Sequence, residues 1–460
     1  LADIAVVEAF SADEPVRVRA FRKPQDGPRH FRFKLYRRDE PAPLADVLPI
    51  LEHMGLKAIV EFGFPIRPAG GPVIYVHEFE LDDPRGEHLV FDDVKACFEA
   101  AMVAVWTGQA EDDGFNRLVL ELSISWREAA LVRALARYRQ QSGLDPSQRV
   151  QEAALSAHPG VTRLILDLFK IRFDPAIRAD PETRKAQGDE VMAEIQDALQ
   201  LVESLDDDRV LRRIALLVQA IVRTSYYQTD AEGRPRSYIS FKIASETLAD
   251  LPAPKPYREI YVWSPEVEGV HLRFGPVARG GLRWSDRRDD FRTEVLGLAK
   301  AQQVKNAVIV PVGAKGGFYP KSLPQGGAPD AVRAAAIEAY KTFLRGLLDI
   351  TDNLTPDGAV IAPRDVVIHE GDDPYLVVAA DKGTATFSDI ANGLAESYDF
   401  WLGDAFASGG SAGYDHKAMA ITARGAWEAV KRHFREMGKD IQAEPFTVVG
   451  VGDMSGDVFG

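Results

Sequence analysis

The chain has 460 residues, of which 46% are hydrophobic and 27% charged, and its formal net charge is −14 at pH 7. This composition is typical of a folded chain with two to four domains and excludes a disordered one. The acidic balance argues against nucleic acid as a general partner. No apolar run approaches the ~18 residues of a membrane helix, and no signal peptide is recognisable, so no membrane partner is expected.

Cys97 is the only cysteine, so an intrachain disulfide is impossible and a reducing, cytoplasmic setting is expected. We interpret this side chain as part of the packing rather than as a reactive thiol. No metal site is predicted. Leu1 is not an initiator methionine and Gly460 stops inside a glycine-rich motif. We therefore expect the chain to be a piece of a longer polypeptide.

Residues 1–90 are predicted to form a small α/β module. Strands are expected at 30–38, 56–66 and 73–81, with helices at 43–55 and 91–107. The order β-α-β-β-α is typical of a ferredoxin-like sandwich. A module that binds a ligand or mediates assembly and a purely structural spacer both agree with this pattern.

Residues 91–250 are predicted to be mostly helical and carry no catalytic constellation. Three consecutive aspartates, 206–208, indicate a break between helices and an N-terminal cap. The proline-rich segment 252–256 is the best candidate for a domain boundary. Beyond it, 257–445 is predicted to be an α/β domain that begins with the strands EIYVWSP and VHLRFGPV.

The segment 271–321 reverses the overall charge, with ten Lys or Arg residues against four acids. Such a reversal suits the capture of a small anion in a cleft. A helix is predicted over 293–306, with Gln302 and Lys305 at its polar end, followed by a buried strand at 307–313. This strand should deliver Lys315 into a Gly-Gly turn. Loss of water there favours the neutral amine and makes Lys315 a candidate acid/base, although a solvated surface lysine is the alternative.

A second candidate is Asp381, which follows the predicted buried strand 375–380. A carboxylate at the carboxyl end of a strand in an α/β sheet points into the ligand crevice, whereas the simpler interpretation is a helix cap. The chain ends with a predicted strand at 446–449 and the spacing Gly450-x-Gly452-x-x-x-Gly456. This variant of the dinucleotide fingerprint predicts that 446–460 begins a Rossmann domain.

The segments 271–321 and 366–392 resemble the glutamate dehydrogenase superfamily, in particular its large NAD-dependent branch. The resemblance implies oxidative deamination of L-glutamate to 2-oxoglutarate and ammonium, with NAD as cofactor. It also implies that the first module is an ACT-like regulatory fold, open to an amino-acid effector, and that the full-length protein is a homo-oligomer. The fold class is thus multidomain α/β, with the ACT-like module, the helical region, the substrate-binding domain and a truncated Rossmann domain.

The same resemblance implies roles for individual residues. Lys315 activates water and Asp381 transfers protons. Gln302 and Lys305 hold the α-carboxylate of the substrate. Arg279 stands where smaller enzymes carry a lysine for the distal carboxylate. The backbone of Gly280 and Gly281 borders the substrate, and the residues implied near the cofactor are Thr422, Gly450, Gly452 and Gly456.

A different class of function fits the same residues, namely a non-catalytic module that binds an amino acid or mediates assembly. The enzyme hypothesis depends on one juxtaposition. Lys315 and Asp381 must face each other at a site lined by cations.

Overall fold

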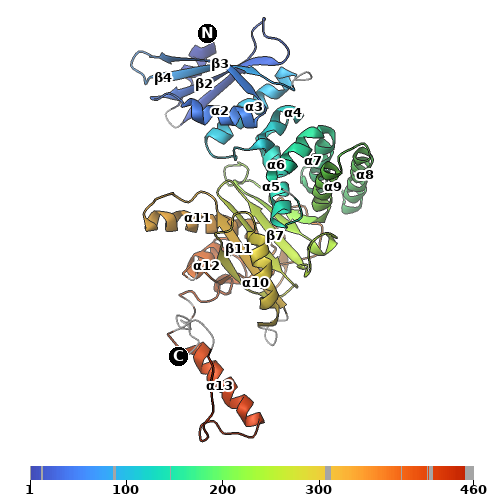
Figure 1. The fold of residues 1–460 in the computed structure, drawn as a ribbon, viewed down its shortest axis with the longest axis vertical. Coiled ribbons are helices and arrows are strands. Elements are labelled where there is room, and N and C mark those ends of the chain that lie inside the picture. The colour runs from blue at the N-terminus through green and yellow to red at the C-terminus, as the bar shows by residue number, and fades with distance from the viewer. Residues whose placement is uncertain are drawn as a thin grey trace.

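The structure is a computed structural model and describes residues 2–11, 14–85, 90–145, 147–305, 312–384, 386–411, 413 and 418–450. Three layers follow one another along the long axis (Figure 1): an N-terminal sheet with its helices, a helical layer, and a larger sheet flanked by helices. Among the described helices, none combines the length and the hydropathy that a membrane span needs.

The N-terminal module is built on a four-stranded antiparallel sheet of order β1-β2-β4-β3. Its elements are α1 (Ala2–Glu8), β1 (Val16–Phe21), β2 (His30–Arg38), α2 (Leu44–His53), β3 (Lys57–Ile66), β4 (Ile74–Asp82) and α3 (Phe91–Trp106). The predicted β-α-β-β-α order is confirmed. The sequence analysis missed β1, although its residues alternate between apolar and basic side chains, and this strand supplies the edge beside β2.

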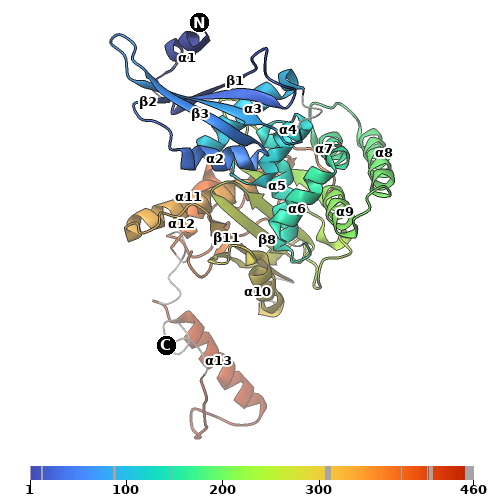
Figure 2. The same ribbon diagram turned by 45° about the horizontal axis from the view of Figure 1, so that its top comes forward.

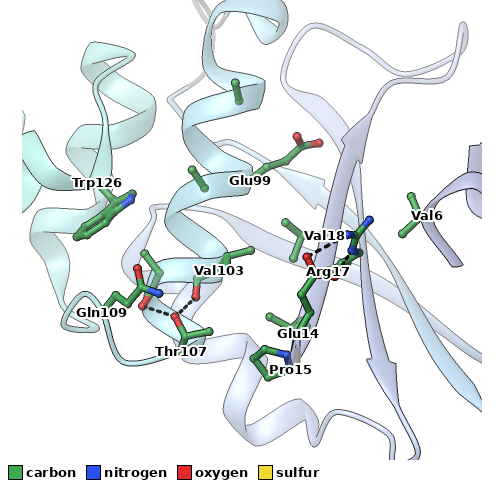
Figure 3. A pocket seen from close by; sticks show the side chains of 14 residues that line it. Val6, Glu14, Pro15, Arg17, Val18, Glu99, Val103, Thr107, Gln109 and Trp126 are labelled. Carbon is green, nitrogen blue, oxygen red and sulfur yellow. Dashed lines mark hydrogen bonds and ion pairs between the residues drawn. The ribbon is translucent and has the colours of Figure 1, made fainter. Parts of the chain in front are cut away.

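The module joins the helical layer through a continuous core. Phe33 stacks on Phe79, Phe98 meets Phe33 edge-on, and this cluster extends without interruption to Leu131 in the helices. A groove of about 700 Å³ runs beside the free edge of β1 (Figure 3). Trp126 from the helical layer lies on one side of this groove, so the module is packed against its neighbour rather than tethered to it.

The helical layer consists of α4 (Leu118–Leu122), α5 (Trp126–Gln141), α6 (Gln148–Ala157), α7 (Pro159–Phe173), α8 (Pro181–Leu199) and α9 (Leu205–Ala220). The predicted break near 206–208 is confirmed, but the cap is Ser204. Its Oγ accepts a hydrogen bond from the Asp207 N–H at 3.2 Å, and the aspartates occupy the first turn instead. Negative charge is favourable there because the helix dipole is positive at its N-terminus.

The larger sheet has the strand order β14-β10-β11-β8-β7-β6-β5, and β9 pairs with β11 outside this path. Its strands are β5 (Ile221–Thr224), β6 (Ile239–Ile243), β7 (Arg258–Trp263), β8 (Val267–Arg273), β9 (Ala278–Arg279), β10 (Gly281–Trp284), β11 (Val312–Pro320) and β14 (Ala379–Ala380). A small hairpin of β12 (Asn353–Leu354) and β13 (Val360–Ile361) lies outside it.

Helices cover both faces of the larger sheet. On one face, Leu272 of β8 shares a core with α10 (Phe291–Lys305) and with the helical layer. On the other, Leu282 of β10 shares a core with α11 (Pro329–Leu348) and α12 (Ser388–Ser397). The last helix, α13 (Ile421–Glu436), has no buried residue and projects away from the sheet in both views (Figures 1 and 2).

Two sequence predictions about this part are wrong. The proline-rich segment 252–256 does not separate two sheets, because it connects β6 to β7 and Ile239 lies opposite Trp263 in the pairing of these strands. The strand predicted at 375–380 is reduced to Ala379–Ala380, since only these two residues lie alongside β10.

The predicted C-terminal strand is also absent within the described part, where residues 445–450 form no strand. An apolar run becomes a strand only beside a partner, and none of the described strands reaches it. Phe446 instead contacts the rings of Trp427 and Phe434 on α13. The predicted strand 307–313 lies outside the described residues except for its last two positions, which begin β11.

Candidate active site

Lys315 lies in the middle of β11 and not in a turn, which corrects the prediction. The strand continues to Pro320 because the two glycines after Lys315 leave room for neighbouring side chains. A Cβ at Gly316 would lie 2.2 Å from Leu282 Cδ2, and a Cβ at Gly317 would lie 2.6 Å from Val295 Cγ2. The glycines therefore serve packing between β10, β11 and α10 rather than a change of chain direction.

The side chain of Lys315 points to the face of the sheet that α10 covers. It lies opposite Leu272 in the antiparallel pairing of β11 with β8, and residues directly opposite each other share a face. Leu272 belongs to the core that also contains Phe291 and Val295 of α10. Lys315 is only 7% exposed, so its amine is largely withdrawn from water.

Lys315 and Asp381 form an ion pair, with 2.5 Å between Nζ and Oδ2. Asp381 directly follows β14, which pairs with β10 in parallel, and β10 in turn lies beside β11. A turn fixes the acid: its backbone N–H donates to Thr384 Oγ1 at 3.0 Å, and this hydroxyl donates to the carbonyl of Leu282 at 2.8 Å. The structure thus brings the two predicted residues together from separate strands.

The ion pair favours the ionised form of the acid. Burial opposes ionisation of Asp381, but the hydrogen bond and the charge of Lys315 outweigh it, so the pKa of Asp381 lies below its ordinary value. Its side chain keeps 25% of its surface exposed, so the pair can be reached from solvent on the side of the acid.

Sequence reasoning missed three residues of this site, which are Arg283, Ser285 and Glu294. Arg283 on β10 places its Nε 3.5 Å from the same Asp381 Oδ2, and its Nη1 donates to Glu294 Oε1 on α10 at 3.0 Å. Ser285 Oγ donates to the other oxygen of Glu294 at 2.6 Å. Arg283 and Ser285 are two positions apart, and every second residue of an extended segment lies on one face, which was the only local signal for this pair.

The end of α10 that carries Gln302 and Lys305 passes over β11. A Cβ at Gly313 would lie 2.6 Å from the backbone carbon of Gln302, so helix and strand approach each other two residues before Lys315. Gln302 is half-buried, and Lys305 is the last residue of the helix. The backbone at the end of α10, which carries Gln302 and Lys305, therefore lies beside the strand that carries Lys315.

Arg279 and Gly281, predicted to lie beside the substrate, are also part of the sheet. Arg279 belongs to β9 and is half-buried, and its Nη2 donates to Ser408 Oγ at 3.2 Å. The carbonyl of Gly280 accepts a hydrogen bond from the Ala379 N–H at 3.1 Å. A Cβ at Gly281 would lie 3.1 Å from Asp381 Cβ, so both glycines border the strand that leads to the acid.

Comparison with known proteins identifies the family of the chain. Residues 194–460 match the family described as "Bacterial NAD-glutamate dehydrogenase, catalytic domain". The chain belongs to this family. Residues 15–94 match "Glutamate dehydrogenase, ACT3 domain", and residues 110–175 match "Glutamate dehydrogenase, helical motif 3". The ACT-like module, the helical region and the catalytic region expected from the sequence are thus present in that order.

Relatives in this glutamate dehydrogenase family are much longer. The NAD-specific glutamate dehydrogenase of Pseudomonas aeruginosa is 51% identical over 458 residues, and that of Halomonas elongata is 49% identical over 460 residues. Each alignment covers 100% of this chain but 28% of the relative. The Mycobacterium tuberculosis protein of the same name is 50% identical, with 29% of its length covered. The chain therefore spans under a third of these proteins.

Of the four residues predicted near the cofactor, the two that the structure describes, Thr422 and Gly450, are not brought to the ion pair. Thr422 lies in the first turn of α13 and Gly450 is exposed, on the part of the chain that projects from the sheet (Figure 2). Gly452 and Gly456 lie outside the described residues. No contact with a dinucleotide follows from these positions. In the described ranges, no group of three or more His, Cys, Asp or Glu side chains is arranged to hold a metal ion.

Replacing Gly280 by alanine is expected to destabilise the larger sheet by at least about 2 kcal/mol. The new Cβ would lie 1.5 Å from the carbonyl oxygen of Ala314, so β9 and β11 would have to separate. The matched control is Gly297→Ala on α10, where no atom lies within 4 Å and alanine favours the helix. Urea unfolding of both variants tests this, and equal midpoints would contradict the close approach of the strands.

Proposed function

We propose that this chain is the substrate-binding part of an enzyme that oxidises L-glutamate to 2-oxoglutarate and ammonium with NAD. One observation carries the proposal: the 2.5 Å contact between a buried amine and a carboxylate, Lys315 and Asp381, beside α10. The relatives at about 50% identity are named NAD-specific glutamate dehydrogenases, which supports this substrate and this cofactor. A buried amine in contact with a carboxylate is typical of a catalytic site, and this favours the enzyme over a binding or assembly module.

The residues of the proposed site have two tasks, which are substrate binding and proton transfer. When bound, the nicotinamide accepts the hydride from the α-carbon of the amino acid. In the proposal, Lys305 and Gln302 bind the α-carboxylate, and Arg279 binds the distal carboxylate. Asp381 accepts a proton from the substrate ammonium, and Lys315 in its neutral form takes a proton from the water that adds to the iminium. Asp381 then returns its proton to the nitrogen of the water adduct, the C–N bond breaks, the departing ammonia takes up the hydroxyl proton as ammonium, and 2-oxoglutarate remains.

The ion pair prepares both groups for these roles. Asp381 is held as a carboxylate, so it can accept a proton, and Lys315 is held in place by that carboxylate. Arg283 supplies a further positive charge beside Asp381.

The remaining parts of the proposal concern the whole protein. We infer an ACT-like module at 1–90, a helical region from 91, and a Rossmann domain beginning at 446–460 with Gly450, Gly452 and Gly456. For the substrate-binding part, predicted at 257–445, we propose a start at β5, and the pairing of β5 and β6 into its sheet supports this. An amino-acid effector at the first module, a homo-oligomer and a cytoplasmic setting belong to the same proposal.

The direct test is an assay of the full-length polypeptide that contains this chain. With L-glutamate and NAD, absorbance of NADH at constant pH should rise, and L-alanine in place of L-glutamate should give little rate. Using NADP in place of NAD tests the cofactor in the same assay. A folded protein that reduces NAD with no amino acid, or only with monocarboxylic ones, would refute the assignment of a dicarboxylic substrate.

A further inference from the structure

Arg283 is a second cation beside the acid of the proposed site. Its Nε lies 3.5 Å from Asp381 Oδ2, the same oxygen that Lys315 Nζ contacts at 2.5 Å. The two cations come from neighbouring strands, because Arg283 belongs to β10 and Lys315 to β11. The carboxylate therefore meets one positive charge from each of two strands.

The backbone holds Arg283 in a fixed place relative to the acid. The residues on either side of Arg283 are hydrogen-bonded to the turn that follows the acid. The carbonyl of Leu282 accepts from Thr384 Oγ1 at 2.8 Å. The Trp284 N–H donates to the carbonyl of Lys382 at 3.1 Å. Strand β10 and this turn are thus bonded to each other both before and after Arg283.

Glu294 of α10 fixes another part of the guanidinium of Arg283. Arg283 Nη1 donates to Glu294 Oε1 at 3.0 Å, and Ser285 Oγ donates to Glu294 Oε2 at 2.6 Å. The side chains of Arg283 and Glu294 are 20% and 16% exposed, so both are largely withdrawn from water. An arginine side chain has many rotamers in water, and a carboxylate beside each of two nitrogens restricts it to one geometry.

The guanidinium of Arg283 supplies a permanent charge. Burial disfavours this charge, but the hydrogen bond with Glu294 and the charge of Asp381 outweigh burial, so the pKa of Arg283 lies above its ordinary value. Arginine is not deprotonated in proteins. Arg283 can therefore act on the charge of the site without taking part in proton transfer.

The starting state of the proposed reaction combines a carboxylate at Asp381 with a neutral amine at Lys315. A neutral amine supplies no charge, and a half-buried carboxylate without a cation is protonated more easily. The groups placed around this carboxylate include Lys315 on β11, Arg283 on β10 and the Lys382 N–H of its own turn, with Glu294 on α10 behind Arg283. Once the amine is neutral, the guanidinium still provides a positive charge.

We propose that Arg283 is a positioning residue that orients Asp381 and keeps it ionised while Lys315 is a neutral amine. Glu294 in turn fixes Arg283 for this task. The inference rests on the function proposed above, because it gives Arg283 a part in the same reaction. Arg283→Lys keeps the charge but cannot reproduce the contacts of the planar guanidinium with two carboxylates, so it separates the effect of charge from that of geometry.

The test is the pH dependence of kcat/KM for L-glutamate in the full-length enzyme. Arg283→Met should move the acid limb of this profile to higher pH, because a fixed positive charge opposes the binding of a proton at the site. Arg283→Lys should bring the acid limb back toward that of the original. The control Arg287→Met should leave it in place, because Arg287 is 45% exposed and pairs with Asp290, which is also exposed.

Glu294 is tested through its dependence on Arg283. Glu294→Gln should lower kcat in the original enzyme and should lower it much less in the Arg283→Met background, because it acts through Arg283. Circular dichroism shows which variants fold, and Arg283→Gln replaces Arg283→Met if the latter does not. Equal effects of Glu294→Gln in the two backgrounds would overturn the role of Glu294.

A second readout does not depend on activity. Infrared difference spectra of the full-length protein against Asp381→Asn show the band of the protonated Asp381 carboxyl. As the pH is lowered, this band should appear at a higher pH in Arg283→Met than in the original. If the original enzyme does not oxidise L-glutamate, the proposed function fails. If it does, but Arg283→Met leaves the acid limb or the infrared titration unchanged, only the inference about Arg283 fails.

Discussion

Lys315→Ala is expected to lower kcat for L-glutamate oxidation by about 10²–10⁴-fold in the full-length enzyme, because it removes the group proposed to activate water. Asp381→Asn should have an effect of similar size, since the amide cannot accept the proton from the substrate ammonium. Asp381 keeps 25% of its side-chain surface exposed, so water can solvate its carboxylate once Lys315 is replaced. The variants should therefore fold, and steady-state kinetics with circular dichroism tests both statements.

The matched control is Lys300→Ala, which removes another lysine from the same basic segment. Lys300 is exposed on α10 and has no proposed contact with the substrate. Its kcat should stay within about twofold of the original, as expected for a surface substitution. Near-native kcat in Lys315→Ala or Asp381→Asn, with the control unchanged, would remove these two residues from the mechanism.

Arg223→Met is expected to lower the free energy of unfolding by about 3–5 kcal/mol, because it leaves buried carboxylates without their partner. Arg223 is fully buried and makes two bonds to Asp352, at 2.7 and 2.8 Å, and a third to Glu370 at 2.8 Å. Lys242 contacts Glu370 as well and lies 2.6 Å from Asp373. This network connects β5 and β6 to the residues between α11 and β14.

The control for this prediction is Arg209→Met, which breaks an ion pair with Asp206 on the surface of α9. Arg209 and Asp206 are 56% and 78% exposed, so the expected change is within about 0.5 kcal/mol. The double variant Arg223→Met/Asp352→Leu should recover part of the loss, because it removes the unpaired charge together with its partner. Equal urea midpoints for Arg223→Met and Arg209→Met would contradict the network.

Local pattern was sufficient for most of the helices and for several strands. The apolar spacing of α2, α3 and α10 predicted these helices to within a few residues. The alternation in β2 and β4 predicted their strands, and the same alternation was present but overlooked in β1. These signals work because the apolar residues of an amphipathic helix or strand recur at a fixed spacing among residues that are close in the sequence.

Pattern was misleading where glycine and proline stood inside a sheet. The pair 316–317 predicted a turn, but it lies, like the pair 280–281, where strands and side chains approach too closely for a Cβ. The proline-rich segment 252–256 predicted a boundary, yet the strands on either side of it pair with each other. A glycine indicates only that a side chain is not tolerated, and the cause lies in residues distant along the chain.

The sequence by itself determined the chemistry available to this protein: a basic segment in an acidic chain, with Lys315 and Asp381 as candidate acid and base and a family resemblance that comparison bore out. Only the tertiary structure decided which of these groups meet. The contact between Lys315 and Asp381 and the approach of Arg283 both depend on the pairing of strands β10, β11 and β14. The spacing of apolar residues shows on which face of a helix or strand a residue lies. Which residue it contacts across that face depends on packing between elements that are distant along the chain.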